Sequence, residues 1–180
     1  MLHPPGGSDD AQAPEEWLVL EDVAYRRVVL CFLVRPGPGG HEVLLGLKRT
    51  GFGAGRLVAL GGKIDGPESA LDAAVREVEE ESGIRLVPAA VREAGRISWS
   101  FPAHPAWNMA ATLFTADDVG QPPAASDEID PRWYAVDDLP WPDMWKDAPH
   151  WIPAVLAGRR VDAHIVMADD DEHVASAVHR

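Results

Sequence analysis

The segment from Glu68 to Ser82 constrains the fold of this chain more than any other, because it contains neither glycine nor proline and Gly83 follows it directly. A glycine in that place is typical of a helix C-cap, so the sequence predicts a helix over residues 68–82. On a helical wheel its apolar residues share one arc of about 100°, which is expected to face a core. These residues are Leu71, Ala74, Val75 and Val78.

The same helix carries three glutamates, Glu77, Glu80 and Glu81, which lie within a second arc of about 100° opposite the apolar one. Like charges at this spacing repel, which costs an isolated helix about 0.2–0.5 kcal/mol per pair. Two interpretations follow. The glutamates form a solvated face that Arg76 partly neutralises, or they are oxygen ligands for a hard cation such as Mg²⁺.

The residues around this helix resemble the Nudix box, a pattern of fixed offsets over residues 62–84. Gly62, Glu68, Arg76-Glu77, Glu80-Glu81, Gly83 and the aliphatic Ile84 occupy its positions. The resemblance implies an α+β chain folded as a Nudix α/β/α sandwich with a mixed β-sheet. It also implies hydrolysis of a nucleoside diphosphate linked to another group, with Mg²⁺ as the cofactor and Mn²⁺ as the alternative.

Two glycines, Gly61 and Gly62, precede the helix, and they let the backbone approach a metal or a phosphate closely. We therefore expect the Gly61 carbonyl to be a further metal ligand, and Gly62 and Lys63 to contact the substrate. Arg76 is expected to orient Glu80 or Glu68. Water bound by a divalent cation is acidified and can attack phosphorus.

The flanking segments 44–56, 126–128 and 141–145 resemble those of animal oxidised-purine nucleoside triphosphate hydrolases, which are MutT-like. This resemblance implies that Glu128 faces the metals and that Lys48 lies near the nucleotide. A solvated loop acid and a strand-edge charge are the respective alternatives. Whether Glu128 or a glutamate of the box is the general base stays open. The resemblance further implies that the base pocket is formed by Phe52, Trp99, Met109, Trp145, Asp147 and Trp151, with Asp147 bonded to the purine edge.

Two positions depart from that subfamily. Val58 stands where an asparagine reads the base, with Leu57 in place of a tryptophan, and Ala148 replaces the second of two adjacent aspartates. Valine and alanine have no hydrogen-bonding side chain, and each lost contact weakens discrimination between bases by about 1–3 kcal/mol. The preferred base and sugar therefore stay open.

The rest of the sequence predicts six strands, a second short helix and two tails. The strands are expected near residues 24–34, 43–47, 92–101, 107–115, 131–136 and 160–168, and the second helix near 150–157. Trp133, within a strand, is expected to be a core residue. The predicted organisation is a disordered tail over residues 1–20, a Nudix domain over 21–168 and a solvated acidic tail over 169–180.

The chain has 180 residues with a formal charge of −13, which disfavours binding to nucleic acid polymers. It has one cysteine and no predicted signal or membrane segment, so we expect a monomer in the cytoplasm. The predicted activity is Mg²⁺-dependent hydrolysis of oxidised purine nucleoside triphosphates to monophosphate and pyrophosphate, a sanitation of the nucleotide pool. The alternatives are a Nudix pyrophosphatase acting on ADP-ribose or a dinucleoside polyphosphate, and a catalytically silent binding domain.

Overall fold

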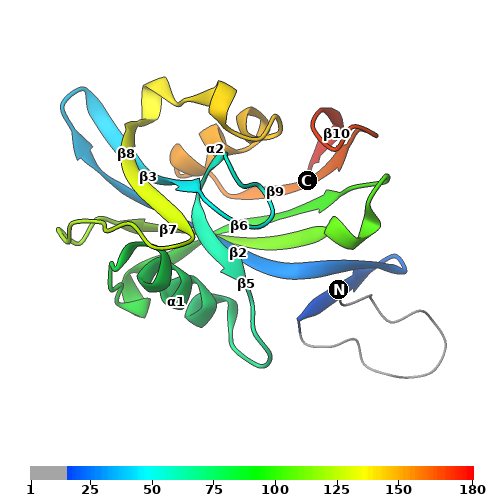
Figure 1. Cartoon of the computed structure of the whole chain (residues 1–180), viewed down its shortest axis with the longest axis horizontal. Coiled ribbons are helices and arrows are strands. Elements are labelled where there is room, and N and C mark those ends of the chain that lie inside the picture. Colours follow the sequence, from blue (N-terminus) through cyan, green and yellow to red (C-terminus); the bar gives the residue numbers. More distant parts are fainter. Residues whose placement is uncertain (1–15) are drawn as a thin grey trace.

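The computed structural model describes residues 16–180. These residues fold around one twisted, mixed β-sheet (Figure 1). Within this range the strands are β1 (Trp17–Leu20), β2 (Val23–Gly37), β3 (Gly40–Lys48), β4 (Leu57–Val58), β5 (Leu60–Lys63), β6 (Val91–Ser100), β7 (Met109–Asp117), β8 (Ile129–Ala135), β9 (Val161–Met167) and β10 (Val174–His179).

The long strand β2 organises the sheet. Its middle pairs in parallel with β7 and antiparallel with β5, and its end forms an antiparallel hairpin with β3. The path through the sheet is β10-β9-β6-β7-β2-β3-β4, with β8 added to β3. Because β2 pairs with β5, the strand that contains Gly61 and Gly62 is fixed to the central strand of the sheet.

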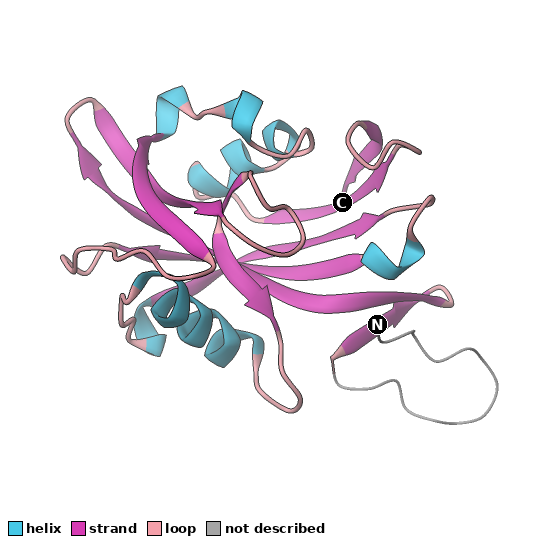
Figure 2. Cartoon of the chain, viewed as in Figure 1, coloured by secondary structure: helices cyan, strands magenta, loops and turns pink. Residues whose placement is uncertain are grey.

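The helices cover both faces of the sheet, as expected for the sandwich (Figure 2). On one face α1 (Ala70–Ser82) packs over a core that includes Val29, Leu33 and Leu60. On the other face a chain of short turns and α2 (Ile152–Leu156) covers a second core around Phe32 and Trp151. The turns are 3-10 helices at Val136–Asp138, Trp141–Asp143 and Ala148–His150, and two more lie at Pro88–Ala90 and Pro105–Trp107.

Helix α1 ends at Ser82 as the sequence predicts, and it begins at Ala70, two residues after the predicted start. The hydroxyl of Ser69 accepts a hydrogen bond from the backbone N–H of Asp72, which satisfies one of the free donors of the first turn. Gly83 closes the helix in the left-handed conformation at φ 73°, and its N–H bonds to the carbonyl of Glu79. Ala74 and Val78 are buried against the sheet, so the predicted apolar face is the packed one.

Both predicted tails need correction at their inner ends. Residues 17–20 form β1, which pairs with β2, so only the part of the N-terminal prediction over residues 1–15 lies outside the described residues. The acidic run after β9 is a turn, not a solvated tail, and it leads into β10 along the edge of β9 (Figure 1). The four consecutive acids obscured the strand because they lie in the turn that precedes it.

Among residues 16–180, no helix is long and apolar enough to cross a membrane. The single cysteine, Cys31, is buried within β2, as its apolar neighbours predict.

Candidate metal and nucleotide site

Helix α1 and strand β5 meet at two carboxylates and two glycines. The N–H of Gly61 donates to Oε2 of Glu81 at 2.9 Å, and Glu81 is only 3% exposed. A Cβ on Gly61 would lie 2.0 Å from the carbonyl oxygen of Val29, and one on Gly62 would lie 2.4 Å from Oε1 of Glu77. Gly62 thus leaves room for the carboxylate of Glu77, and Gly61 lets β5 lie close to the backbone of β2.

The predicted ridge of three glutamates is divided in the structure. Glu81 is buried beside Gly61, the Glu77 side chain is 12% exposed, and the Glu80 side chain is 59% exposed. A helical wheel gives direction but not depth, and β5 packs over one side of the ridge and buries it. Glu77 and Glu81 therefore face the sheet, while Glu80 reaches toward solvent.

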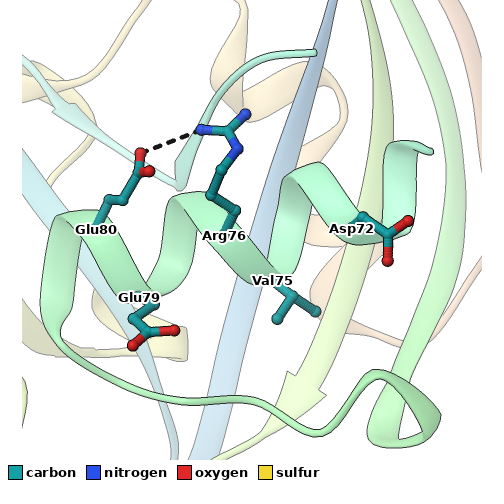
Figure 3. Close-up of a pocket in the computed structure, with 5 residues that line it drawn as sticks. All are labelled: Asp72, Val75, Arg76, Glu79 and Glu80. Carbon is teal, nitrogen blue, oxygen red and sulfur yellow. Dashed lines mark hydrogen bonds and ion pairs between the residues drawn. The ribbon is translucent and has the colours of Figure 1, made fainter. Parts of the chain in front are cut away.

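Arg76 connects the acidic groups of this region. Its guanidinium donates to Glu68 at 2.6 Å, to Glu77 at 2.9 Å and to Glu80 at 3.1 Å, as well as to the carbonyl of Lys63. The predicted contacts with Glu80 and Glu68 are both present. The Arg76–Glu80 pair lies over a shallow hollow on the helix surface, which Asp72, Val75 and Glu79 also line (Figure 3).

The two inward carboxylates are held in an unfavourable environment for negative charge. Burial raises the pKa of Glu81 to about 7, although the Gly61 N–H and Lys48 act in the opposite direction. Burial also raises the pKa of Glu77, against the opposing effect of Arg76, and Glu128 contributes to the increase at both groups. A bound cation would offset this cost.

An open cleft of about 620 Å³ runs from these carboxylates along the sheet. At the acidic end it is lined by Gly61, Gly62, Lys63, Arg76, Glu77, Glu80, Glu128 and Lys48. Glu128 is exposed and lines this end of the cleft, where its charge helps to raise the pKa of Glu77 and of Glu81. Of the predicted catalytic and metal residues, Glu81 alone does not line the cleft and lies behind Gly61.

The other end of the cleft is aromatic, and it contains every residue predicted for the base pocket. Asp147 is 4% exposed, and its Oδ2 accepts hydrogen bonds from the indole N–H of Trp99 at 2.7 Å and of Trp151 at 2.8 Å. Among the hydrogen bonds of the described residues, both bonds to this carboxylate fall on Oδ2. Oδ1 is therefore the oxygen left to meet a ligand.

Trp145 and Phe52 form the outer part of this end. Their rings stack with centroids 5.2 Å apart and planes inclined by 18°. Met109, the first residue of β7, also lines the cleft and pairs with Trp99 on β6. Trp133, by contrast, packs against the other core beneath Arg35, as predicted for a core residue.

The two departures from the resembling subfamily are both at this end. Val58 lines the cleft and is partly buried, so no amide is present at that position to read a base. Ala148 also lines the cleft and is buried. Asp147 is thus the one acidic side chain among the cleft residues at the aromatic end.

Sequence reasoning missed Asp65, which lines the cleft, and the pair formed by Arg56 and Glu172, which supports the cleft wall at Trp145. Asp65 lies 3.7 Å from Arg76. Arg56 lies over the ring of Trp145 at 4.1 Å and forms an ion pair with Glu172. Asp65 stands just beyond the two glycines, which is a local signal, whereas nothing in the sequence links Arg56 to a residue 116 positions away.

Comparison with known proteins identifies the family. The family model of the NUDIX domain matches residues 24–155 of this chain. This chain belongs to the Nudix hydrolase family. An oxidized purine nucleoside triphosphate hydrolase from Mus musculus is 38% identical over 131 residues, which cover 73% of this chain and 82% of the mouse protein. The protein of that name from Danio rerio is 37% identical, over 74% of this chain and 81% of its own length.

Solved structures agree on the fold. The crystal structure of a mutator MutT protein from Bacillus halodurans superposes with a TM-score of 0.69 at 23% identity, covering 85% of this chain and 96% of that one. This likeness confirms the Nudix architecture predicted from the box.

Nudix hydrolases generally need divalent cations, and the donor set of this cleft fits one. Carboxylates and a backbone carbonyl are the oxygen ligands that hard cations prefer. Within residues 16–180, no three acidic, histidine or cysteine side chains are already gathered as a closed metal-binding group. Glu77 and Glu80 are instead bonded to Arg76, and Glu81 to the Gly61 N–H.

Proposed function

We propose that this Nudix hydrolase cleaves oxidised purine nucleoside triphosphates to the monophosphate and pyrophosphate, using Mg²⁺, with Mn²⁺ as the alternative cation. One observation carries the proposal. A single cleft joins the acidic groups of α1 to a buried carboxylate held between two indoles, so one nucleotide can reach both ends. The named activity of the mouse and zebrafish relatives supports this choice of substrate.

At the acidic end, we assign Glu77, Glu80 and Glu81 to the cation, with Glu128 and the Gly61 carbonyl as further ligands. When bound, the cation supplies an acidified water and neutralises charge on the phosphate oxygens. Arg76 holds Glu77 and Glu80 in place through its hydrogen bonds. Lys48 and Lys63 line the same end and offer positive charge to the phosphates.

The proton that leaves the attacking water needs an acceptor at this end of the cleft. Glu77 and Glu128 both line this end of the cleft, so their carboxylates are the candidates for that acceptor. The side chain of Glu81 is hydrogen-bonded behind Gly61, which suits a role in holding the site more than one in proton transfer.

At the aromatic end, Phe52, Met109, Trp145 and Trp151 are proposed to enclose the base. Asp147 presents Oδ1 to the base edge because Trp99 and Trp151 occupy Oδ2. A fixed acceptor at the floor of an aromatic pocket favours a base edge that carries N–H donors.

The replacements at Val58 and Ala148 favour a second candidate, a Nudix pyrophosphatase for another nucleoside diphosphate derivative such as ADP-ribose or a dinucleoside polyphosphate. With two polar base contacts absent, discrimination between purines is expected to be weaker. The intact set of three glutamates argues against a silent binding domain, because their repulsion has no structural benefit.

A substrate panel tests the proposal. Oxidised and plain purine triphosphates, ADP-ribose and a dinucleoside tetraphosphate are each assayed with Mg²⁺ for monophosphate and pyrophosphate. We expect pyrophosphate release from an oxidised purine triphosphate with the highest kcat/KM, and no turnover in EDTA. A higher kcat/KM for ADP-ribose selects the second candidate, and full turnover in EDTA contradicts the role of the metal.

We further propose that the enzyme acts as a monomer in the cytoplasm. The buried, unpaired Cys31 suits a reducing compartment. Light scattering of the purified chain tests the oligomeric state, and cell fractionation tests the location.

A further inference from the structure

The turn between β9 and β10, residues 168–173, contacts two loops that are distant in sequence. Glu172 forms an ion pair with Arg56, in the loop between β3 and β4. Asp171 Oδ2 lies 2.5 Å from Nδ1 of His104, in the loop between β6 and β7. The side chains of Arg56 and Glu172 are 25% and 32% exposed, so their pairing is partly shielded from water.

Arg56 transmits this contact to Trp145. Its guanidinium carbon lies 4.1 Å from the centroid of the indole, which is favourable cation–π geometry. The same guanidinium donates from Nη1 to the carbonyl of Met144 at 3.4 Å, while Nη2 bonds Glu172. Arg56 therefore holds both the ring of Trp145 and the backbone that precedes it.

The second contact of the turn reaches Trp145 by another route. His104 stacks on Trp107 with centroids 4.3 Å apart, and the ring of Trp107 meets Phe52 edge-on at 5.4 Å. Phe52 in turn stacks on Trp145. The two contacts that the turn makes with other loops thus both lead to the indole of Trp145.

The turn is held in shape by its own hydrogen bonds. Asp170 Oδ1 accepts the backbone N–H groups of Glu172 at 3.0 Å and His173 at 2.9 Å. The N–H of Ala168 donates to the carbonyl of His173 at 2.7 Å, and β10 then pairs with β9. Glu172 is therefore presented from a fixed backbone, so it can act as an anchor for Arg56.

We propose that Glu172 and Arg56 are positioning residues for substrate binding: Glu172 fixes Arg56, and Arg56 fixes Trp145 as the outer wall of the base pocket. Trp145 and Phe52 line the cleft, whereas Arg56 and Glu172 do not, so the pair acts through the indole and not by touching substrate. The inference rests on the proposed function, which assigns the aromatic end to the base.

The first test compares Glu172→Gln with Asp169→Asn, a matched loss of charge at an exposed neighbour. KM and kcat are measured with whichever nucleotide of the panel has the highest kcat/KM. A partly shielded ion pair contributes modestly, so we expect Glu172→Gln to raise KM by about threefold to tenfold with kcat within about twofold. Asp169→Asn is expected to leave both constants unchanged.

The second test asks whether Glu172 acts through Arg56. If it does, adding Glu172→Gln to Arg56→Gln changes KM no further, because the anchor has lost the group it holds. Multiplication of the two separate effects in the double variant overturns the proposal.

The third test needs no substrate, so it separates this inference from the proposed function. In the ¹⁵N-labelled protein the indole N–H signal of Trp145 is assigned by its loss in Trp145→Phe. Glu172→Gln is expected to shift or broaden that signal and to leave the signal of Trp133, on the other face of the sheet, in place. An unchanged Trp145 signal overturns the proposal, as does a moved signal with KM equal to that of Asp169→Asn. Failure of every triphosphate in the panel contradicts only the proposed function.

Discussion

The two ends of the cleft are assembled in different ways. The acidic end comes mostly from one continuous stretch, Gly61 to Glu81, which contains the glycine pair and the helix, and only Lys48 and Glu128 are added from elsewhere in the chain. The aromatic end brings together the β3–β4 loop, β6, β7, the 3-10 turns before α2 and, through Glu172, the turn after β9. Most residues of the acidic end are thus close together in the sequence, whereas long-range packing brings together the residues of the aromatic end.

This difference has a consequence for how each end responds to change. A substitution at the acidic end removes a charge that the reaction itself requires, so it is expected to reduce kcat. A substitution at the aromatic end alters how a base is held, so it is expected to change KM or the ranking of substrates. The predictions below test that division, and each has a result that would contradict it.

The largest effect is expected for Glu81→Gln. The substitution keeps the shape of the side chain but removes the charge that the cation and the transition state need, so kcat should fall by a factor of about 10² or more. Glu79→Gln is the control, because Glu79 bonds Arg85 on the outer surface of the helix. Steady-state kinetics with thermal melts of both variants make the comparison. Near-normal kcat in folded Glu81→Gln, or an equal loss in Glu79→Gln, contradicts the assignment.

How far each end could be predicted from the sequence follows the same division. The end of α1 was predicted correctly because Gly83 caps it locally, whereas the predicted start at Glu68 lies just before the cap at Ser69. The burial of Glu81 was not predicted, since it depends on the N–H of Gly61 reaching the helix from β5. A helical wheel contains no information about the strand that packs on it.

At the aromatic end the residues were predicted but their contacts were not. Asp147 was expected to bond the purine edge. In the structure one of its carboxylate oxygens already accepts hydrogen bonds from Trp99 and Trp151, which the sequence did not indicate. The link between Glu172 and Arg56 spans 116 positions, and a run of acids carries no sign of such a partner. Contacts of this kind depend on strand order, which local patterns do not determine.

A second prediction concerns Trp145→Ala at the aromatic end. Removal of the indole takes away a large flat surface and also the platform on which Phe52 and Arg56 rest. Stacking of a base on an aromatic ring contributes about 1–3 kcal/mol, so KM should rise by roughly tenfold to a hundredfold while kcat changes far less. Trp133→Ala, on the other core, is the control for loss of an indole. If Trp145→Ala lowers kcat and leaves KM unchanged, the aromatic end does not act through substrate binding alone, which contradicts the division between the two ends.

Asp147→Asn is expected to alter the ranking of bases. The single carbonyl oxygen of asparagine can still accept both indole N–H groups, which turns its NH₂ group toward the position of Oδ1. A donor then replaces an acceptor, so bases with an acceptor at that edge should gain about tenfold in kcat/KM relative to those with N–H donors. The measurement is kcat/KM for guanine-type and adenine-type triphosphates. An unchanged ratio means that Asp147 does not read the base.

The smallest effect is expected for Val58→Asn, which sharpens the comparison by adding a polar contact at the aromatic end. Val58 lines the cleft on β4 and also packs against the core beneath α1, so an asparagine there adds an amide to the wall of the cleft and gives up part of that packing. One added hydrogen bond between neutral groups contributes about 0.5–1.5 kcal/mol, so preference for one purine should sharpen by about twofold to tenfold. Val58→Thr, which keeps the shape and adds a hydroxyl in place of a methyl group, separates polarity from base reading. The measurement is the ratio of kcat/KM for oxidised dGTP to kcat/KM for plain dGTP. If this ratio keeps its wild-type value in both Val58→Asn and Val58→Thr, the base lies elsewhere in the cleft. The likeness to the mouse and zebrafish enzymes would then extend only to the fold and the acidic end.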